Sequence, residues 1–173
     1  MKFIVIPFLV DLSKFCLKDS VKKENIITYC GYMGGGKDNL EDMIRIFYGD
    51  AYLYNNYRLV LIGDAEKDEF DKIKAFAKRV DLYKKIEFTG RLEHQEVIEY
   101  LMKSTIHILV RSDVDKNKGG FPSKLAEYLA TAIPSIITNV GEVSMYLEDT
   151  NNIFFVEKNN NQLFTSKLVN VLK

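Results

Sequence analysis

The segment that determines the fold prediction is residues 118–138, KGGFPSKLAEYLATAIPSIIT. A glycine pair leads into Pro122, and proline suits a first helical turn because its missing N–H would have no partner there. Leu125 and Leu129 then lie on one face of an amphipathic run, and Pro134 opens a β-branched run. The segment therefore predicts a turn, a helix, a second turn and a strand, in that order.

The same alternation of strand and helix patterns continues along the chain. Short apolar or β-branched runs predict strands at residues 26–32, 58–63, 85–90, 106–110, 134–138 and 152–156. Apolar residues with a helical period predict helices at residues 40–47, 70–80, 97–101, 125–132, 142–147 and 162–172. Strands that alternate with helices over short loops form right-handed βαβ units. We therefore expect a single-domain α/β fold, with a Rossmann-like parallel sheet and helices on both faces.

Length and composition fit one globular domain. The chain has 173 residues, and 47% of them are hydrophobic, which is enough to bury a core. Lys and Arg total 24, as do Asp and Glu, so no global basic bias indicates nucleic acid or an anionic membrane surface as a partner. Cys16 and Cys30 have neither metal-ligand nor disulfide spacing, and no window approaches the roughly 20 apolar residues of a membrane span. We expect a cytoplasmic protein.

The first 25 residues fit the alternation poorly. The run FIVIPFLVD, residues 3–11, has the pattern of a strand followed by a turn, and residues 16–25 are polar. We therefore predict that residues 1–25 are a linker remnant with an edge strand from a preceding domain, and that residues 26–173 form the domain itself. The Tyr-rich residues 49–58 predict a helix end and a surface loop without chemistry.

The first loop with a chemical pattern is GYMGGGKDNL, residues 31–40, because ligands bind such sheets beyond the carboxyl ends of the strands. Gly31 ends a strand, three glycines follow, and Lys37 opens a helix. Glycines let backbone N–H groups approach an anion, and a helix N-terminus and a lysine add positive charge. Asp38 stands where a Walker A loop needs Ser or Thr. Phosphate binding and a flexible loop with a solvated lysine are both consistent with this segment.

Two further loops have a glycine where a strand ends. Gly63 permits a tight turn and leaves room for a ligand close to the backbone. Gly90 precedes Arg91, which is either a contact for an anion or a base edge or a merely solvated side chain. His94 has no Cys, His or acidic partner at metal-ligand spacing, and His107 lies in an apolar strand, where a satisfied core histidine is typical. We predict no metal site and no Ser/His/Asp arrangement.

The helix start at residues 122–127 carries the densest chemistry. Ser123 and Lys124 place two N–H groups, a hydroxyl and an ammonium at the positive end of the helix. Glu127 follows about one helical turn later, within reach of vicinal hydroxyls such as those of a ribose. The pattern fits a nucleotide, with donors for a diphosphate and a carboxylate for the sugar. A well-capped helix with an exposed Lys–Glu pair is the alternative interpretation.

The segment GGFPSKLAEYLATAIPSIIT resembles the signature of group 1 glycosyltransferases of the GT-B fold, which use nucleotide-activated sugars. In that family a glycine-rich GF turn leads into a helix with a ribose-binding glutamate and then into a G-x-P-V-I strand. Gly31 and Lys37 are in register with the family's G-R-x4-K segment, and VIPFLVDLSKF is similar to the linker that ends its N-terminal domain. The ordered resemblance covers nearly the whole chain.

The resemblance implies which residues hold the donor. Lys37 and Lys124 would have catalytic roles, because they would stabilise charge on the departing diphosphate without an obligatory metal or other cofactor. The implied nucleotide-binding residues are Gly31, Gly63, Gly90, Arg91, Leu92, Gly120, Phe121, Pro122, Ser123, Lys124 and Glu127.

The resemblance also implies a function in polysaccharide biosynthesis. The chain would be the C-terminal, donor-binding half of a GT-B enzyme that transfers a sugar, with retention, from a UDP- or GDP-sugar to a glycan or lipid-linked acceptor. Its partners would be the nucleotide-sugar and a missing N-terminal acceptor-binding domain, and the full enzyme would work at the cytoplasmic face of the membrane. We expect the isolated chain to bind nucleotide weakly and to transfer no sugar.

Two residues depart from the family pattern. Gly119 stands where many members have the first glutamate of an E-x7-E motif, and Tyr32 stands where an arginine often follows the first glycine. Both lost groups usually contact the donor, so Lys124 is expected to supply charge that Tyr32 does not. Two other functions fit the same sequence. One is a protein-interaction module that uses exposed apolar surface near residues 4–9, and the other is a domain similar to nucleotide-sugar epimerases.

Overall fold

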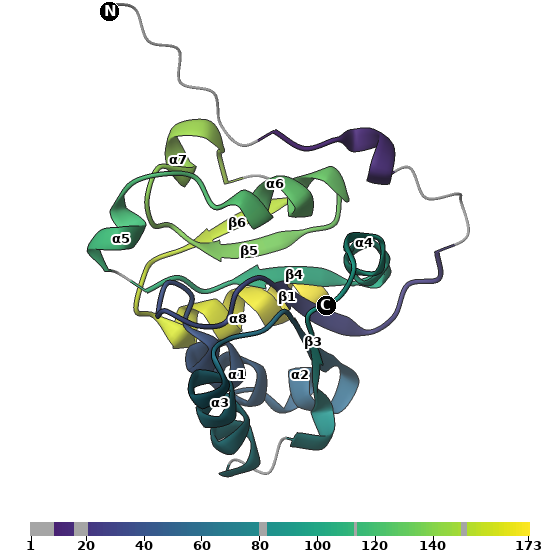
Figure 1. Ribbon diagram of the computed structural model, residues 1–173, viewed down its shortest axis with the longest axis vertical. Coiled ribbons are helices and arrows are strands. Elements are labelled where there is room, and N and C mark those ends of the chain that lie inside the picture. Colours follow the sequence, from purple (N-terminus) through teal and green to yellow (C-terminus); the bar gives the residue numbers. More distant parts are fainter. Residues whose placement is uncertain (1–8, 16–20, 80–82, 113, 150–151) are drawn as a thin grey trace, which may run out of the picture.

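The protein folds around one six-stranded sheet in which all strands are parallel (Figure 1). The computed structural model describes residues 9–15, 21–79, 83–112, 114–149 and 152–173. The strands are β1 (Ile26–Cys30), β2 (Arg58–Ile62), β3 (Ile86–Gly90), β4 (Ile106–Leu109), β5 (Ser135–Thr138) and β6 (Ile153–Val156). All six lie within the predicted strand segments, so the predicted α/β fold is confirmed.

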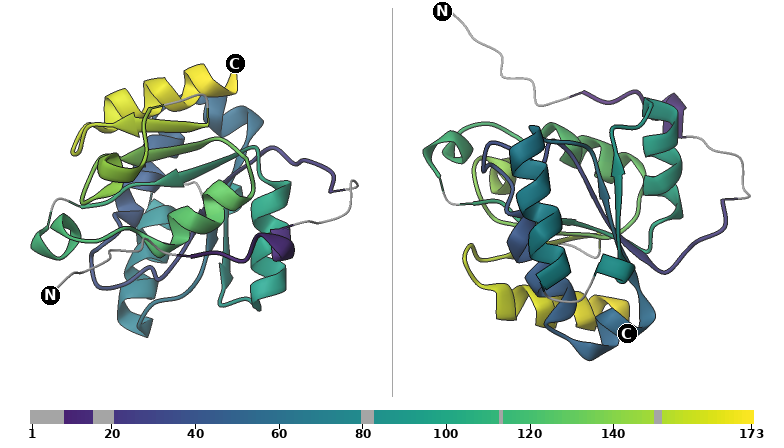
Figure 2. Two further views of the ribbon diagram at one scale, coloured as in Figure 1. Left: turned by 90° about the horizontal axis from the view of Figure 1, so that it is seen from above. Right: turned by 60° about the horizontal axis from the view of Figure 1, so that its bottom comes forward.

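The strand order is β3-β2-β1-β4-β5-β6, and this order locates the candidate site. The chain builds β1, β2 and β3 outward in one direction and then returns to place β4 on the free side of β1. Ile27 pairs with Ile106 and Thr28 pairs with His107 across that junction. The connections that follow β1 and β4 therefore lead to helices on opposite faces of the sheet, which opens a crevice at the carboxyl ends of these two strands (Figures 1 and 2).

Helices cover both faces of the sheet, as predicted (Figures 1 and 2). One face carries α1 (Leu40–Tyr48), α3 (Lys67–Arg79) and α8 (Asn161–Leu172), and the other carries α4 (His94–Lys103) and α6 (Ser123–Ala130). The shorter elements are η1 (Leu12–Phe15), α2 (Ala51–Asn56), η2 (Tyr83–Lys85), α5 (Asp115–Lys118) and α7 (Val143–Tyr146). Because both faces are covered, β2 and β4 are buried almost along their whole length and do not alternate between buried and exposed residues.

The first helix shows how local sequence sets these elements. The side chain of Asn39 caps α1 by accepting a hydrogen bond of 3.1 Å from the backbone N–H of Asp42. Leu40, Ile44 and Phe47 then point into the core, where each is at most 3% exposed. The expectation that Lys37 opens this helix is wrong, because the cap at Asn39 sets the start and leaves Lys37 in the preceding loop.

The prediction of a surface loop over residues 49–58 is also wrong. Asp50 caps a short helix, α2, by accepting a hydrogen bond of 2.7 Å from the backbone N–H of Tyr52. Leu53 is fully buried, and the hydroxyl of Tyr52 donates to the carbonyl of Leu172. The tyrosines of this segment therefore tie α2 to the C-terminal helix instead of covering a loop.

The start of the described chain runs past α6 and α4 before it enters β1 (Figure 1). Leu9 and Leu12 are largely exposed there, whereas Phe15 is buried. Most of the strand predicted at residues 3–11 lies outside the described residues, and the domain boundary at residue 26 stays a prediction. In the part of the chain that the structure describes, no helix is long and apolar enough to cross a membrane.

Candidate functional site

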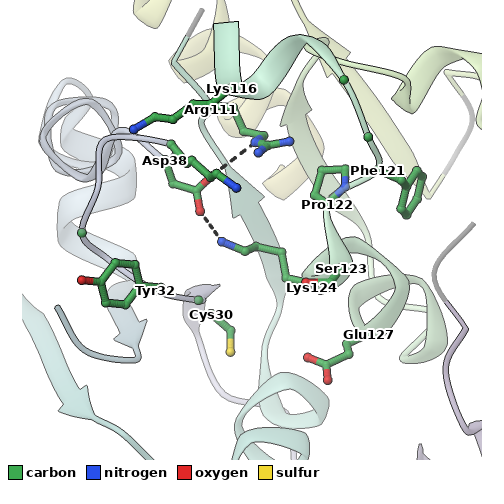
Figure 3. Close-up of a pocket in the computed structure, with 15 residues that line it drawn as sticks. Cys30, Tyr32, Asp38, Arg111, Lys116, Phe121, Pro122, Ser123, Lys124 and Glu127 are labelled. Carbon is green, nitrogen blue, oxygen red and sulfur yellow. Dashed lines mark hydrogen bonds and ion pairs between the residues drawn. The ribbon is translucent and has the colours of Figure 1, made fainter. Parts of the chain in front are cut away.

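A pocket of about 600 Å³ opens at the carboxyl ends of β1 and β4 (Figure 3). Its walls are the loop after β1, the loop after β4 and the first turns of α6. The pocket brings together eight of the predicted site residues, namely Gly31, Lys37, Gly120, Phe121, Pro122, Ser123, Lys124 and Glu127. The two residues that depart from the family pattern, Tyr32 and Gly119, also line it.

The other predicted site residues, Gly63 and residues 90–92, lie beside the pocket and not in its lining. The backbone N–H of Gly63 donates to the carbonyl of Gly90 at 3.0 Å, so the ends of β2 and β3 meet. Gly63 has φ +127°, and a Cβ there would overlap the carbonyl oxygen of Gly31. Gly63 therefore shapes the first pocket loop by permitting a close approach of two backbones.

Asp38 lies at the centre of a buried polar cluster in the pocket floor. Its Oδ2 contacts the ammonium of Lys124 and accepts a hydrogen bond of 2.8 Å from the hydroxyl of Tyr29. Lys124 also donates to that hydroxyl at 3.1 Å. Burial, together with the adjacent Asp38 carboxylate, raises the pKa of Tyr29 well above its usual value. Tyr29 therefore stays protonated and acts as the donor to Asp38.

Arg111 approaches the same carboxylate from the end of β4. Its Nε lies 3.4 Å from Oδ1 of Asp38, and its Nη2 donates to Oδ1 of Asn117 at 2.6 Å. The side-chain amide of Asn117 donates in turn to the carbonyls of Lys37 and Ser112, both at 2.7 Å. The cluster therefore joins the loop after β1 to the loop after β4 through side chains that are buried.

Sequence reasoning missed Tyr29, Asp38, Arg111 and Asn117 as parts of the site. In the sequence, Asp38 stands out only as the residue that excludes a Walker A loop, and no pattern singles out Arg111. The signal that could have found them is a charged residue directly after a predicted buried strand, as Arg111 is after β4. The contact between Asp38 and Arg111 depends on the strand order, which cannot be recognised from the sequence of a single loop.

Glu127 has a partner from the loop after β3. The Nε2 of His94 lies 3.2 Å from Oε1 of Glu127, with 50% of the histidine side chain and 27% of the glutamate side chain exposed. The sequence offered no partner for His94, because the first residue of α4 and the second turn of α6 are far apart along the chain. The contact brings the loop at residues 90–94 to the edge of the pocket.

Two titratable groups, Cys30 and His107, are kept uncharged by their surroundings. Burial, with a smaller effect from Glu127, raises the pKa of Cys30 to about 12, so its thiol stays protonated. His107 donates from Nε2 to the carbonyl of Leu101 at 3.1 Å, and the Ser135 hydroxyl lies 3.4 Å from its Nδ1. Burial lowers the pKa of His107 to about 4. The prediction of a satisfied core histidine is therefore confirmed.

The charges around the pocket favour a multivalent anion. Among the residues that the structure describes, four basic side chains line it (Lys37, Arg111, Lys116 and Lys124) against two carboxylates (Asp38 and Glu127), an excess of two positive charges. The first turn of α6 also faces the cavity and adds the partial positive charge of its unpaired N–H groups. No group of three or more His, Cys, Asp or Glu side chains that could hold a metal ion occurs among the described residues.

Comparison with known proteins identifies the family. The sequence profile of the family described as "Glycosyl transferases group 1" matches residues 17–173. No curated protein sequence matches the chain significantly. Because the profile covers most of the chain, this protein belongs to the group 1 glycosyltransferase family, as the sequence resemblance predicted.

Solved structures of other glycosyltransferases share the fold. The C-terminal domain of LpcC from Francisella tularensis has a TM-score of 0.77 and 20% identity over 94% of this chain and 87% of that domain. HepE from Anabaena, solved in complex with UDP, has a TM-score of 0.78 and 13% identity over 94% of this chain and 46% of its own. The lipopolysaccharide galactosyltransferase WaaB has a TM-score of 0.70 and 18% identity over 87% of this chain and 42% of its own. The chain thus spans less than half the length of HepE and WaaB.

Proposed function

We propose that this chain is the donor-binding part of a glycosyltransferase, and that its pocket holds the nucleoside diphosphate of a UDP- or GDP-sugar. The observation that carries the proposal is the position of Lys124 and Glu127 in one cavity with an excess of positive charge. That cavity lies where the strand order reverses, which is where doubly wound sheets bind nucleotides. The complex of HepE with UDP supports the choice of UDP as one candidate.

The diphosphate would lie against the first turn of α6. Lys37, Lys124 and the backbone N–H groups of Phe121, Ser123 and Lys124 would stabilise the negative charge that develops as the sugar–phosphate bond breaks. Phosphate oxygens are well matched to helix N-termini and lysine ammonium groups. This stabilisation of the leaving group requires no proton transfer from the chain, and Cys30 and Tyr29 are held protonated in any case.

The nucleoside would lie toward the loop after β3. Glu127 would accept hydrogen bonds from the ribose hydroxyls, and residues 90–92 would present backbone groups to the base. The contact between His94 and Glu127 supports this arrangement, because it places that loop beside the carboxylate. Gly63 would contribute by keeping the ends of β1 and β2 close together.

Sugar transfer would need a second domain that binds the acceptor, a glycan or a lipid-linked sugar. The lengths of HepE and WaaB, more than twice the matched region, support this division of labour. We expect transfer with retention of configuration, in polysaccharide biosynthesis at the cytoplasmic face of the membrane. The isolated chain would bind the nucleotide without transferring sugar.

Calorimetric titration with UDP and GDP tests the proposal. The wild-type chain should bind one of the two at millimolar concentration or tighter, and Glu127→Ala should weaken that binding by about tenfold, because the ribose hydroxyls lose a charged acceptor. Glu99→Ala, which removes an exposed carboxylate from α4, is the matched control and should bind as the wild type does. The site assignment fails if neither nucleotide binds or if Glu127→Ala changes nothing.

A second candidate function is protein binding, and one groove favours it. An apolar groove of about 390 Å³ separates the N-terminal segment from α6 and α7, with Leu12, Leu129 and Tyr146 among its exposed lining residues. Apolar surface of this kind often contacts another protein or domain. Stable oligomers in size-exclusion chromatography, together with no response to either nucleotide, would favour this function over donor binding.

A further inference from the structure

We propose that Arg111 is a further anion-binding residue of the pocket and that Asp38 is its counter-charge in the free protein, which pairs with Arg111 and Lys124 until the anion replaces it. The proposal rests on the proposed function only for the identity of that anion, a diphosphate. In Figure 3 the carboxylate of Asp38 lies between the two basic side chains, with an interaction drawn to each. The sequence alone assigns no binding role to Arg111 or Asp38.

Arg111 is buried without enough partners. Its side chain is 9% exposed, and its Nε makes no hydrogen bond to any described residue, although it faces Asp38 at 3.4 Å. A buried guanidinium is costly unless its N–H groups and its charge are satisfied. Because the residue also lines the 600 Å³ pocket, an anion there would balance its charge and accept hydrogen bonds from those guanidinium N–H groups that face the cavity.

Among the described residues, the floor of the pocket has one carboxylate, Asp38, for two cations, Arg111 and Lys124. The side chain of Asp38 is 5% exposed, and that of Lys124 is 16% exposed. A purely structural buried ion pair would have balanced charge, whereas this cluster keeps one positive charge in excess next to an open cavity. A diphosphate would supply the balancing charge and additional acceptor oxygens for Arg111 and Lys124.

The two cations differ in how firmly the fold holds them. The backbones of Asp38 and Arg111 form an antiparallel bridge, and the N–H of Ser112 donates to the carbonyl of Lys37 at 3.1 Å. Arg111 is thus fixed by the loops around it, while Lys124 reaches Asp38 on a flexible four-carbon stem. Binding of the anion would therefore keep Arg111 in place and draw the ammonium of Lys124 from Asp38 toward the phosphate oxygens.

Substitutions of Arg111 and Asp38 should change pyrophosphate binding in opposite directions. This result would distinguish an anion-binding cluster from a purely structural ion pair. Arg111→Gln should weaken the binding of inorganic pyrophosphate by at least about tenfold, because a charged hydrogen-bond donor is lost. Asp38→Asn should strengthen the binding by about tenfold, because it removes a negative charge close to the anion and keeps the size of the side chain. Both substitutions should lower the Tm of the free protein, since each breaks a buried ion pair.

The experiment is calorimetric titration of the folded chain with inorganic pyrophosphate and, in parallel, with UDP and GDP. Lys118→Gln is the matched control: it removes an exposed charge that precedes Gly119 but does not itself line the pocket, and it should leave pyrophosphate binding within about twofold of the wild type. Equal pyrophosphate binding by Arg111→Gln and wild type would overturn the inference. So would weaker binding by Asp38→Asn, and that variant alone decides the matter if Arg111→Gln does not fold.

The parallel titrations separate this inference from the proposed function. If the wild type binds UDP or GDP but Arg111→Gln binds pyrophosphate unchanged, the inference fails and donor binding stands. If the wild type binds pyrophosphate with the predicted opposite effects but binds neither nucleotide, the anion site stands and donor binding fails. If the wild type binds no pyrophosphate, the inference fails whatever the nucleotides do.

Discussion

The carboxyl ends of β1 and β4 differ from those of β2 and β3, although glycine marks three of these four strand ends. Beyond β1 and β4 the loops meet where Asp38 bridges Arg111, but a pocket opens between residues 30–34 and 119–124, and long charged side chains such as Lys124 enter it. Beyond β2 and β3 the backbones meet, with a hydrogen bond of 3.0 Å from Gly63 to Gly90. The strand order causes this difference. Strands β2 and β3 are added on one side of β1, whereas β4 and the later strands are added on its other side. A glycine at a strand end therefore indicates a ligand site only where neighbouring loops separate.

The largest expected effect concerns the closed ends of β2 and β3. A Cβ on Gly63 would overlap the carbonyl oxygen of Gly31, so Gly63→Ala should lower the free energy of unfolding by about 3 kcal/mol. Gly90 has φ +71° but open space around it, so Gly90→Ala should cost only about 1 kcal/mol of backbone strain. Urea unfolding of both variants measures the difference. Equal losses would show that the two strand ends do not pack as described.

The second effect lies beneath the pocket, in β4, where His107 is a buried polar group with complete hydrogen bonding. Its pKa is lowered from 6.5 to about 4 by burial, so below pH 6.5 the unfolded chain takes up a proton that the folded chain does not. Stability should therefore fall by about 3 kcal/mol as the pH drops from 6.5 to 4. Urea unfolding across this range should show a steeper fall for the wild type than for His107→Gln. Parallel curves for the two proteins would contradict the assignment.

The third effect compares the loss of nucleotide binding on substitution of two basic residues. Lys124 lies in the pocket at the ends of β1 and β4, and Arg91 lies after β3. Lys124→Met should weaken UDP or GDP binding by about a hundredfold, because it removes an ammonium from the pocket floor. Arg91→Met should change the same binding by no more than about twofold, since the exposed Arg91 follows β3 and does not line the pocket. Fluorescence or calorimetric titration compares the two variants. A larger loss for Arg91→Met would move the site to the other pair of strand ends.

The smallest effect tests a side-chain contact between the two regions. His94 and Glu127 form a half-exposed pair, and such pairs contribute little to binding or stability. His94→Ala should therefore weaken nucleotide binding by about threefold, while Glu127→Ala has the larger effect. If His94→Ala lowers the affinity for the nucleotide as much as Glu127→Ala does, the histidine itself contacts the nucleotide.

The sheet could be predicted from the sequence because its strands are buried on both faces and read as apolar runs. Helix α2 could not be predicted, because its polar and aromatic residues show no helical pattern. The helix depends on the cap at Asp50 and on a contact with α8. The candidate site was predictable where a loop carries its own pattern, as at residues 120–127. The cluster of Asp38 and Arg111 was not, since it forms only when the strand order brings two distant loops together.

Mapping of the amide chemical shifts of the ¹⁵N-labelled chain during titration with UDP and GDP tests the central claim most directly. The claim is that the open ends of β1 and β4 bind a nucleoside diphosphate. The largest shift changes should fall on residues 31–38 and 119–127, with smaller changes at residues 90–94 and none near Gly49 at the far end of α1. Shift changes confined to the apolar groove beside α7, or no changes with either nucleotide, would contradict the claim.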